Sequence, residues 1–430
     1  MSTALLTDHY ELTMLQAALA SGNAHRRSVF ELFARRLPGG RRYGVVAGTG
    51  RLLDAVEDFH FGAAELDFLR AHEVVDEQTL AWLADYRFSG DIWGYPEGEA
   101  YFPHSPVLIV ESSFGEAVLL ETLMLSILNH DSAIASAASR MTWAAGDRPC
   151  IEMGSRRTSE RAAVAAARAA YVAGFTATSN LEASRCYGVP STGTSAHSFT
   201  LLHDTEEEAF RAQVSSLGKD TTLLLDTYDV MQAVRLAVEI AGPELGAVRI
   251  DSGDLGVLAR EVRSRLDELG ATATRIVVTS DLDEYAIAGL ASAPVDGYGV
   301  GTQLVTGSGH PTCGFVYKLV AHEGTDGLMV SVAKKSKDKA SLGGRKYALR
   351  RLDTDDVAEA EVIGIGQPPE GDTNDRPLLV QLVKDGEVVG RQPLDVARWR
   401  HVRSREELPV LARTLQKGDP VIPTVHVGGD

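Results

Sequence analysis

Residues 221–226 and 247–251 read Thr-Thr-Leu-Leu-Leu-Asp and Ala-Val-Arg-Ile-Asp, two apolar runs that each end in an aspartate. Two further apolar runs, 275–279 and 297–300, are also followed by polar residues. Strands that alternate with helices at this spacing predict a parallel α/β sheet, either open or closed into a barrel. The intervening helix patterns cover Val230–Ala241, Leu255–Leu269 and Glu284–Ala291.

Polar residues gather at the carboxyl ends of these predicted strands. In α/β barrels this is the face on which active sites are built, so we interpret the set as a candidate site. For Asp254, and for Asp283 nearby, the alternative is a structural role as the N-cap of the helix that follows. The set comprises Asp226, Arg249, Asp251, Asp254, Asp281 and Thr302.

Glycines follow the last predicted strand, in Gly299-Val-Gly-Thr302 and Thr306-Gly-Ser-Gly309. Such turns offer backbone N–H groups without Cβ bulk, and at a barrel rim they hold phosphates. The match is short, and many tight turns look like it. The chain contains neither a Walker-type Gly-Lys-Ser/Thr nor a dinucleotide fingerprint, so the phosphate interpretation rests on these turns.

A second segment, Gly188-Val-Pro-Ser-Thr-Gly-Thr-Ser-Ala-His-Ser-Phe-Thr-Leu201, surrounds one histidine with small hydroxyl side chains. Pro190 and Gly193 interrupt regular structure there. Hydroxyls and free N–H groups in a turn suit anion binding, and a histidine among them can titrate near neutrality or act as a nucleophile. The alternative is a turn whose His197 only bonds nearby backbone. The segment alone leaves both interpretations open.

Composition narrows the class of protein. With 430 residues, 44% of them hydrophobic and 23% charged, the chain is an ordinary globular one with room for a large core. A net charge of −17 argues against nucleic acid or an acidic membrane surface as the main partner. The three cysteines are scattered, the N-terminus has no basic region, and we expect no apolar run of membrane-spanning length. We therefore expect a cytoplasmic protein.

Outside the α/β part the sequence is richer in strands and turns. Short strand patterns joined by Pro and Gly occupy residues 90–113, and Thr325-Asp-Gly327 and Lys384-Asp-Gly386 predict hairpins. Arg156 and Arg157 lie between a predicted strand and the helix that follows it. This position suits either a solvated edge of the sheet or a functional site. The basic run Lys334–Lys346 is either a solvated loop or a loop that lies next to an anion-binding site, and the sequence leaves both interpretations open.

Taken together, these segments resemble nicotinate phosphoribosyltransferase along nearly the whole chain. Each motif is short, but their order and spacing are specific. The matching segments are Thr7-Asp-His-Tyr-Glu-Leu-Thr-Met14, Glu121-Thr-Leu-Met-Leu-Ser-Ile-Leu-Asn129, Glu152-Met-Gly-Ser-Arg-Arg157, Thr178-Ser-Asn180, Gly193-Thr-Ser-Ala-His-Ser198, Arg249-Ile-Asp-Ser-Gly-Asp254 and Gly299-Val-Gly-Thr302.

The resemblance implies a type II phosphoribosyltransferase fold: an irregular α/β barrel, 118–314, with a second α+β domain built from residues 1–117 and 315–430. It implies a homodimer with interface active sites. The implied reaction joins nicotinate to 5-phosphoribosyl 1-diphosphate and gives nicotinate mononucleotide and diphosphate, in NAD biosynthesis. ATP hydrolysis would drive it through phosphorylation of the histidine that matches His197, with Mg²⁺ as the implied metal cofactor.

The resemblance also implies roles for individual residues. Asp226 and Asp251 would orient His197 and hold Mg²⁺ or ribose hydroxyls. Arg249 would pair with the nicotinate carboxylate while Thr194 donates a hydroxyl. The remaining implied contacts are Tyr10 of a partner subunit stacked on the ring, Arg156 on phosphate or carboxylate groups, and Gly301 with Thr302 around the ribose 5-phosphate.

The nearest alternative is nicotinamide phosphoribosyltransferase, whose members carry an aspartate at the position of Ser179. A serine there lacks the carboxylate that would repel nicotinate. Quinolinate phosphoribosyltransferase needs a second carboxylate pocket, and a metal-dependent hydrolase would need histidine pairs that the sequence lacks. A non-catalytic binding protein would be favoured only without His197 or the phosphate turn. The chain departs from the family at Met153, where phenylalanine is common, and at Gly343-Gly344, where Pro-Gly is common.

Overall fold

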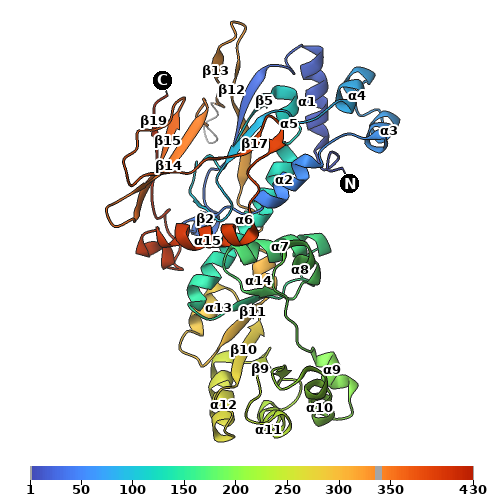
Figure 1. The fold of residues 1–430 in the computed structure, drawn as a ribbon, viewed down its shortest axis with the longest axis vertical. Coiled ribbons are helices and arrows are strands. Elements are labelled where there is room, and N and C mark those ends of the chain that lie inside the picture. Colours follow the sequence, from blue (N-terminus) through green and yellow to red (C-terminus); the bar gives the residue numbers. More distant parts are fainter. Residues whose placement is uncertain (1, 335–340, 430) are drawn as a thin grey trace. The chain divides into compact units, whose positions relative to one another are not determined.

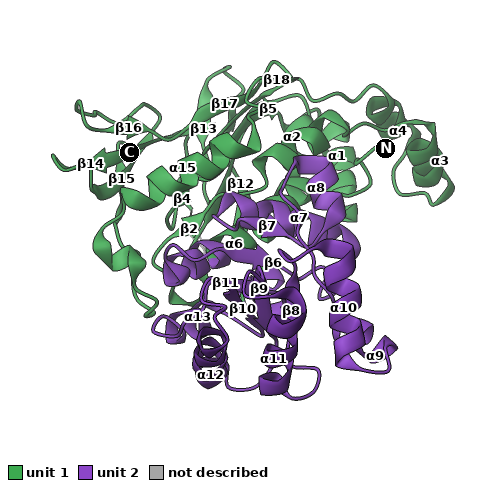
Figure 2. Ribbon diagram, turned by 60° about the horizontal axis from the view of Figure 1, so that its bottom comes forward, with its two compact units in different colours: residues 1–136, 310–430 green, residues 137–309 purple. Residues whose placement is uncertain are grey.

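The structure is a computed structural model that describes residues 2–334 and 341–429. The chain forms two compact units, one made of residues 1–136 and 310–430 and the other of residues 137–309 (Figure 2). The sequence-based division placed the boundaries at 117/118 and 314/315. The units themselves divide within the long helix α6 (Glu121–Ala145) and just before the strand β12 (Phe315–Glu323).

The first unit is built on a seven-stranded sheet in the order β13-β12-β1-β5-β3-β17-β18 (Figure 1). Its neighbouring strands are antiparallel, and the two predicted hairpins are confirmed as the pairs β12–β13 and β17–β18. The strands besides β12 are β1 (Arg27–Ala34), β3 (Asp91–Gly94), β5 (Leu108–Ser113), β13 (Met329–Ser331), β17 (Val380–Lys384) and β18 (Glu387–Val388).

Smaller sheets and helices complete this unit. A four-stranded sheet has the order β16-β14-β15-β19, and a short pair joins β2 to β4. The strands are β2 (Gly44–Val45), β4 (Ala100–Tyr101), β14 (Lys346–Leu352), β15 (Ala358–Ile365), β16 (Arg376–Pro377) and β19 (Thr424–Val427). The helices are α1 (His9–Ala20), α2 (Thr49–Glu57), α3 (Ala63–Ala71), α4 (Glu77–Ala84), α5 (Phe114–Val118) and α15 (Leu394–Glu406).

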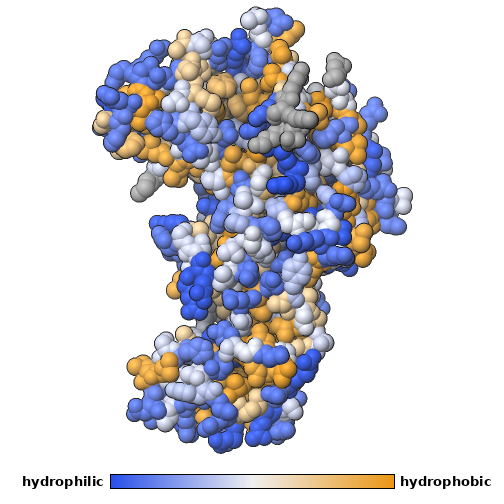
Figure 3. Space-filling view, turned by 180° about the vertical axis from the view of Figure 1, so that it is seen from behind, coloured by the Kyte–Doolittle hydropathy of each residue, from blue (hydrophilic) through white to orange (hydrophobic). Residues whose placement is uncertain are grey.

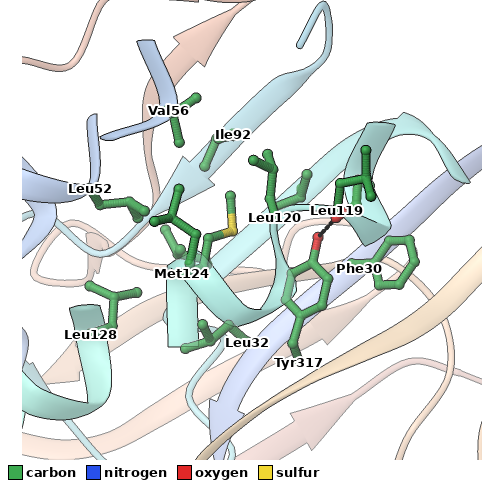
Figure 4. Close-up of a cluster of buried hydrophobic side chains, with 14 of the residues drawn as sticks. Phe30, Leu32, Leu52, Val56, Ile92, Leu119, Leu120, Met124, Leu128 and Tyr317 are labelled. Carbon is green, nitrogen blue, oxygen red and sulfur yellow. Dashed lines mark hydrogen bonds between the residues drawn. The ribbon is translucent and has the colours of Figure 1, made fainter. Parts of the chain in front are cut away.

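A large apolar core lies between the seven-stranded sheet and the helices α1, α2 and α6 (Figure 4). The rings of Phe30 and Tyr317 stack with centroids 4.8 Å apart, and the Tyr317 hydroxyl donates to the Ala117 carbonyl at 3.0 Å. Leu120, just before α6, and Met124 and other residues of α6 belong to the same core cluster. Because α6 supplies this core from its first turns, the unit extends beyond the expected boundary at residue 117.

The stretch Phe114–Ala145 corrects one expectation. It is 32 residues long and, by length and composition alone, apolar enough to cross a membrane, but 67% of its most apolar window is buried inside the protein. A helix in the core of a globular protein can be equally long and apolar.

Hydrophilic residues are spread over the face drawn in Figure 3, with smaller hydrophobic groups between them.

The basic run Lys334–Lys346 lies partly outside the described residues, which omit 335–340. Its last member, Lys346, is not a solvated loop residue. It is 2% exposed, and its ammonium donates to the Glu31 carboxylate at 2.9 Å and to the Gly344 carbonyl at 2.9 Å. The end of the run is therefore fixed to β1 by a buried ion pair.

The second unit contains a six-stranded parallel sheet in the order β7-β6-β11-β10-β9-β8. The predicted alternation of strands and helices is confirmed. Within the described part of the chain the sheet ends at β7 and β8, so it forms a curled half-barrel rather than a closed barrel. The strands are β6 (Cys150–Glu152), β7 (Ala177–Thr178), β8 (Thr222–Leu224), β9 (Ala247–Ile250), β10 (Arg275–Ser280) and β11 (Gly297–Val300).

Helices flank this sheet, and α12 packs against β9 and β10 (Figure 1). The capping alternative raised for Asp254 and Asp283 is confirmed for both. Asp254 accepts from the Val257 N–H at 3.1 Å, and Asp283 accepts from the Ala286 N–H at 2.8 Å. The helices are α7 (Glu160–Val172), α8 (Leu181–Tyr187), α9 (His197–Leu202), α10 (Glu206–Leu217), α11 (Val230–Ala241), α12 (Leu255–Glu268), α13 (Glu284–Gly289) and α14 (Thr302–Val305).

Candidate active site

A cavity of about 220 Å³ opens at the carboxyl ends of β6, β9, β10 and β11. Three arginines and two aspartates line it, so its lining carries a net positive charge in a protein of net charge −17. Such a pocket suits a phosphorylated or carboxylated ligand. The lining residues are Met153, Arg156, Arg157, Arg249, Asp251, Thr279, Ser280, Asp281, Gly299, Gly301 and Thr302.

Asp226 and Asp251 lie at the ends of the adjacent strands β8 and β9. The Asp226 carboxylate accepts from the Asp251 N–H at 3.1 Å and from the Ser252 hydroxyl at 2.5 Å. Asp251 in turn accepts from the Thr279 hydroxyl. One oxygen of Asp226, Oδ1, is buried and has no hydrogen-bond partner among the described residues. This carboxylate pair therefore keeps an acceptor for a ligand or cation.

His197 is the first residue of α9, with a side chain that is 39% exposed. Its Nδ1 lies 3.1 Å from the Thr227 hydroxyl, and its Nε2 lies 3.8 Å from Asp251 Oδ2. The first contact is a hydrogen bond, whereas the second is too long for one. Thr227 was not predicted from the sequence; its place directly after Asp226 was the only available signal. The imidazole is thus held at one nitrogen and open at the other.

Arg249 extends from β9 into the cavity and donates to the Thr194 hydroxyl at 2.8 Å. Its Nε is buried without a partner in the described chain. Burial lowers the pKa of Arg249, and the carboxylates of Asp251 and Asp226 act in the opposite direction. Because arginine stays protonated in proteins, the guanidinium remains a cation with donors to spare.

The turn after β6 forms one side of the cavity and meets the end of β11. The Met153 N–H donates to the Val300 carbonyl at 2.8 Å. A Cβ added to Gly299 would meet the Thr279 methyl carbon first and would also lie 2.7 Å from the Met153 sulfur. A side chain at 299 would therefore displace Thr279, whose hydroxyl bonds Asp251, as well as Met153.

Five of the predicted site residues are not among those that line the cavity: His197, Asp226, Thr194, Ser179 and Tyr10. The first three lie beside it, through the contacts with Asp251 and Arg249 described above. Ser179 follows β7, is exposed, and donates its N–H to the Glu152 carbonyl at 2.8 Å. Tyr10 belongs to the other unit, on α1, where its side chain is 45% exposed. Burial and the carboxylate of Glu121 raise the pKa of Tyr10 to about 12, so its hydroxyl stays protonated. The roles predicted for both residues rest on the sequence resemblance.

The family model and the relatives that match this chain all carry the same family name. Residues 5–129 match the family description nicotinate phosphoribosyltransferase N-terminal domain. The nicotinate phosphoribosyltransferase pncB1 of Mycobacterium tuberculosis is 58% identical over 429 residues, covering 98% of this chain and 94% of that protein. The nicotinate phosphoribosyltransferase of Bacillus subtilis is 37% identical, covering 81% of this chain and 73% of the relative.

Solved structures agree with the fold. Human nicotinic acid phosphoribosyltransferase matches with a TM-score of 0.84 at 25% identity, covering 98% of this chain and 97% of that one. A nicotinate-nucleotide pyrophosphorylase from Pyrococcus furiosus matches with a TM-score of 0.77 at 23% identity, covering 94% and 95%, and shows the fold alone. Both likenesses extend over nearly the whole of each chain.

Proposed function

Because the chain belongs to the nicotinate phosphoribosyltransferase family, we propose that it joins nicotinate to 5-phosphoribosyl 1-diphosphate. The ring nitrogen of nicotinate bonds to C1 of the ribose, the C1–oxygen bond breaks, and diphosphate leaves. The observation that carries the proposal is the arginine-lined cavity with Asp251 at its edge, in a chain 58% identical to a relative of that name. The test is detection of nicotinate mononucleotide by mass spectrometry after incubation with both substrates.

The cavity's own residues supply the binding groups. Arg249 pairs with the nicotinate carboxylate, and Thr194, already bonded to Arg249 at 2.8 Å, adds a hydroxyl. Arg156 faces a phosphate or carboxylate group, and Gly301 with Thr302 contacts the ribose 5-phosphate. The positive charge that develops on the ribose as diphosphate leaves is stabilised by Asp251.

His197 is the residue that would react with ATP. When Nδ1–H donates to Thr227, the Nε2 lone pair is available to attack the γ-phosphoryl group of ATP, and ADP leaves. Asp251, 3.8 Å from Nε2, offsets the positive charge that the ring gains. Later hydrolysis of the phosphohistidine returns the histidine and releases phosphate. The resemblance implies that the phosphorylated enzyme binds its substrates better, and this difference in affinity would couple ATP hydrolysis to transfer.

The residues present fit a magnesium ion. Asp226 and Asp251 would hold it, since Asp226 keeps a buried oxygen without a partner and Mg²⁺ binds through one or two carboxylates plus substrate phosphates. No group of three or more His, Cys, Asp or Glu side chains is arranged for a metal in the described residues, so the protein would supply only part of the coordination. The bound ion would neutralise the charge of the leaving diphosphate.

The proposal extends to assembly and location. We expect a homodimer in which Tyr10 of a second copy stacks on the nicotinate ring. We also expect the half-barrel to be part of an irregular α/β barrel. Neither a nucleic acid nor a membrane is expected as a partner. Cys150, Cys186 and Cys313 are free thiols, which agrees with folding in the reducing cytoplasm.

The alternative substrate is nicotinamide. By the sequence resemblance, enzymes that use nicotinamide are expected to carry a carboxylate at the position of Ser179, and such a group would repel nicotinate. The names of the relatives reported above also favour nicotinate. Parallel assays with the two bases separate the alternatives.

A further inference from the structure

Glu152, the last residue of β6, is a buried carboxylate behind the cavity wall, 1% exposed and absent from the cavity lining. Its two carboxylate oxygens accept hydrogen bonds from different segments. One oxygen accepts from the Gly154 N–H and the other from the Thr178 hydroxyl. Burial raises the pKa of Glu152, and the bonds from Thr178 and Gly154 oppose that rise. The side chain therefore ties the turn after β6 to the neighbouring strand β7.

Asn180 closes this link into a ring. Its N–H donates to the Thr178 hydroxyl oxygen at 2.9 Å, and its side-chain amide donates to the Ser155 hydroxyl at 3.0 Å. Ser155 directly follows Gly154, so the bonds run from Glu152 to the turn, across to Asn180 and back through Thr178. A closed set of bonds restricts the turn more than any one of them alone.

The turn held in this way carries cavity residues. Met153 and Arg156 line the cavity, and the turn is closed by the Arg157 N–H, which donates to the Gly154 carbonyl at 2.8 Å. Within the described residues no carboxylate pairs with Arg156, so the direction of its side chain depends on the position of its backbone. Glu152 reaches the cavity only through this turn.

We propose that Glu152 is a positioning residue whose ring of bonds with Thr178 holds Arg156 and Met153 in place for an anionic substrate. The inference rests on the proposed function for the identity of that substrate, and on geometry for the rest. Binding groups held by a rigid second layer lose less affinity to disorder than groups on a free loop.

Thr178→Val tests this with little change of volume, because it removes the hydroxyl from the ring and leaves Glu152 in place. Thr176→Val is the matched control on the same segment: the Thr176 hydroxyl donates to the Cys150 carbonyl at 3.2 Å, outside the ring. Glu152→Ala and Glu152→Gln complete the set, since the glutamine amide can still accept from Gly154 and donate to Thr178. Full-length proteins are compared for binding of inorganic diphosphate by calorimetry, for the KM of nicotinate and for melting temperature.

The expected result is that Thr178→Val weakens diphosphate binding and raises the KM for nicotinate by about tenfold each, measured well below its melting temperature. Thr176→Val stays within about twofold of wild type, and Glu152→Gln recovers most of what Glu152→Ala loses. A Thr178→Val protein that melts earlier but keeps both constants would show a purely structural role and overturn the inference. Wild-type protein that fails to bind diphosphate would overturn it too. If diphosphate binding follows the expected order but nicotinate is not turned over, the positioning role stands and the proposed function fails.

Discussion

Arg249 on β9 donates a 2.8 Å hydrogen bond to Thr194, three residues before His197, and so links the cavity to the segment that carries the histidine. A nicotinate carboxylate that binds Arg249 competes for this donor or shares the guanidinium with Thr194. If Arg249 binds the carboxylate as proposed, substrate binding and the placement of His197 would be coupled through this one side chain.

Arg249→Ala should raise the KM for nicotinate by a factor of about 10 to 100 with a smaller effect on kcat, because it removes a charged hydrogen-bond donor used in binding. Steady-state kinetics at saturating phosphoribosyl diphosphate gives both constants. Arg235→Ala, on the exposed side of α11 where Arg235 pairs with Glu239 at 2.8 Å, is the control. An unaltered KM in Arg249→Ala would place the carboxylate site elsewhere.

His197→Ala should lose the stimulation by ATP and keep slow phosphoribosyl transfer. Thr227→Val should slow formation of the phosphohistidine about tenfold, since it removes the group that fixes Nδ1. Transfer of labelled γ-phosphate from ATP to the protein measures the second effect. ATP stimulation that persists in His197→Ala contradicts the phosphohistidine role.

Ser179→Asp should shift the preference from nicotinate towards nicotinamide, because a carboxylate repels one base and accepts a hydrogen bond from the amide of the other. The ratio of kcat/KM for the two bases is the measurement. Ser179→Asn, similar in size but neutral, should change the ratio far less. If Ser179→Asp leaves the ratio unchanged, this residue plays no part in choosing the base.

Glu206, at the start of α10, should make stability depend on pH. Burial and the charge of Asp229 raise its pKa from 4.5 to about 7, and one of its oxygens is buried without a partner in the described chain. The folded state holds the proton of Glu206 more tightly than the unfolded state does. The protonated carboxyl therefore adds to the free energy of unfolding below pH 4.5, and this stabilisation is lost as the pH rises through about 7.

Glu206→Gln should therefore flatten this dependence and raise stability above pH 7 by about 1–2 kcal/mol relative to wild type. Denaturant unfolding at several pH values measures it. Glu207→Gln is the control, since Glu207 is exposed and pairs with Arg211 at 2.7 Å. Parallel pH profiles for wild type and Glu206→Gln would refute the assignment.

Much of the α/β unit followed from the sequence, because short strand patterns such as Ala247–Ile250 alternate regularly with helix patterns, and the carboxyl ends of parallel strands meet at one edge of a sheet. The same reasoning brought Arg249, Asp251, Asp281 and Thr302 into one cavity. It missed Thr227, Thr279 and Glu152, whose contacts depend on how neighbouring strands align. The division of the compact units within α6 has no signal in the sequence, since α6 reads as one continuous helix and shows no break where its packing partners change.

Diphosphate release in the presence of phosphoribosyl diphosphate, Mg²⁺ and ATP, measured in parallel with nicotinate and with nicotinamide, tests directly whether the cavity selects nicotinate. We expect strong turnover with nicotinate and little with nicotinamide. Turnover with nicotinamide instead, or with neither base, would contradict it.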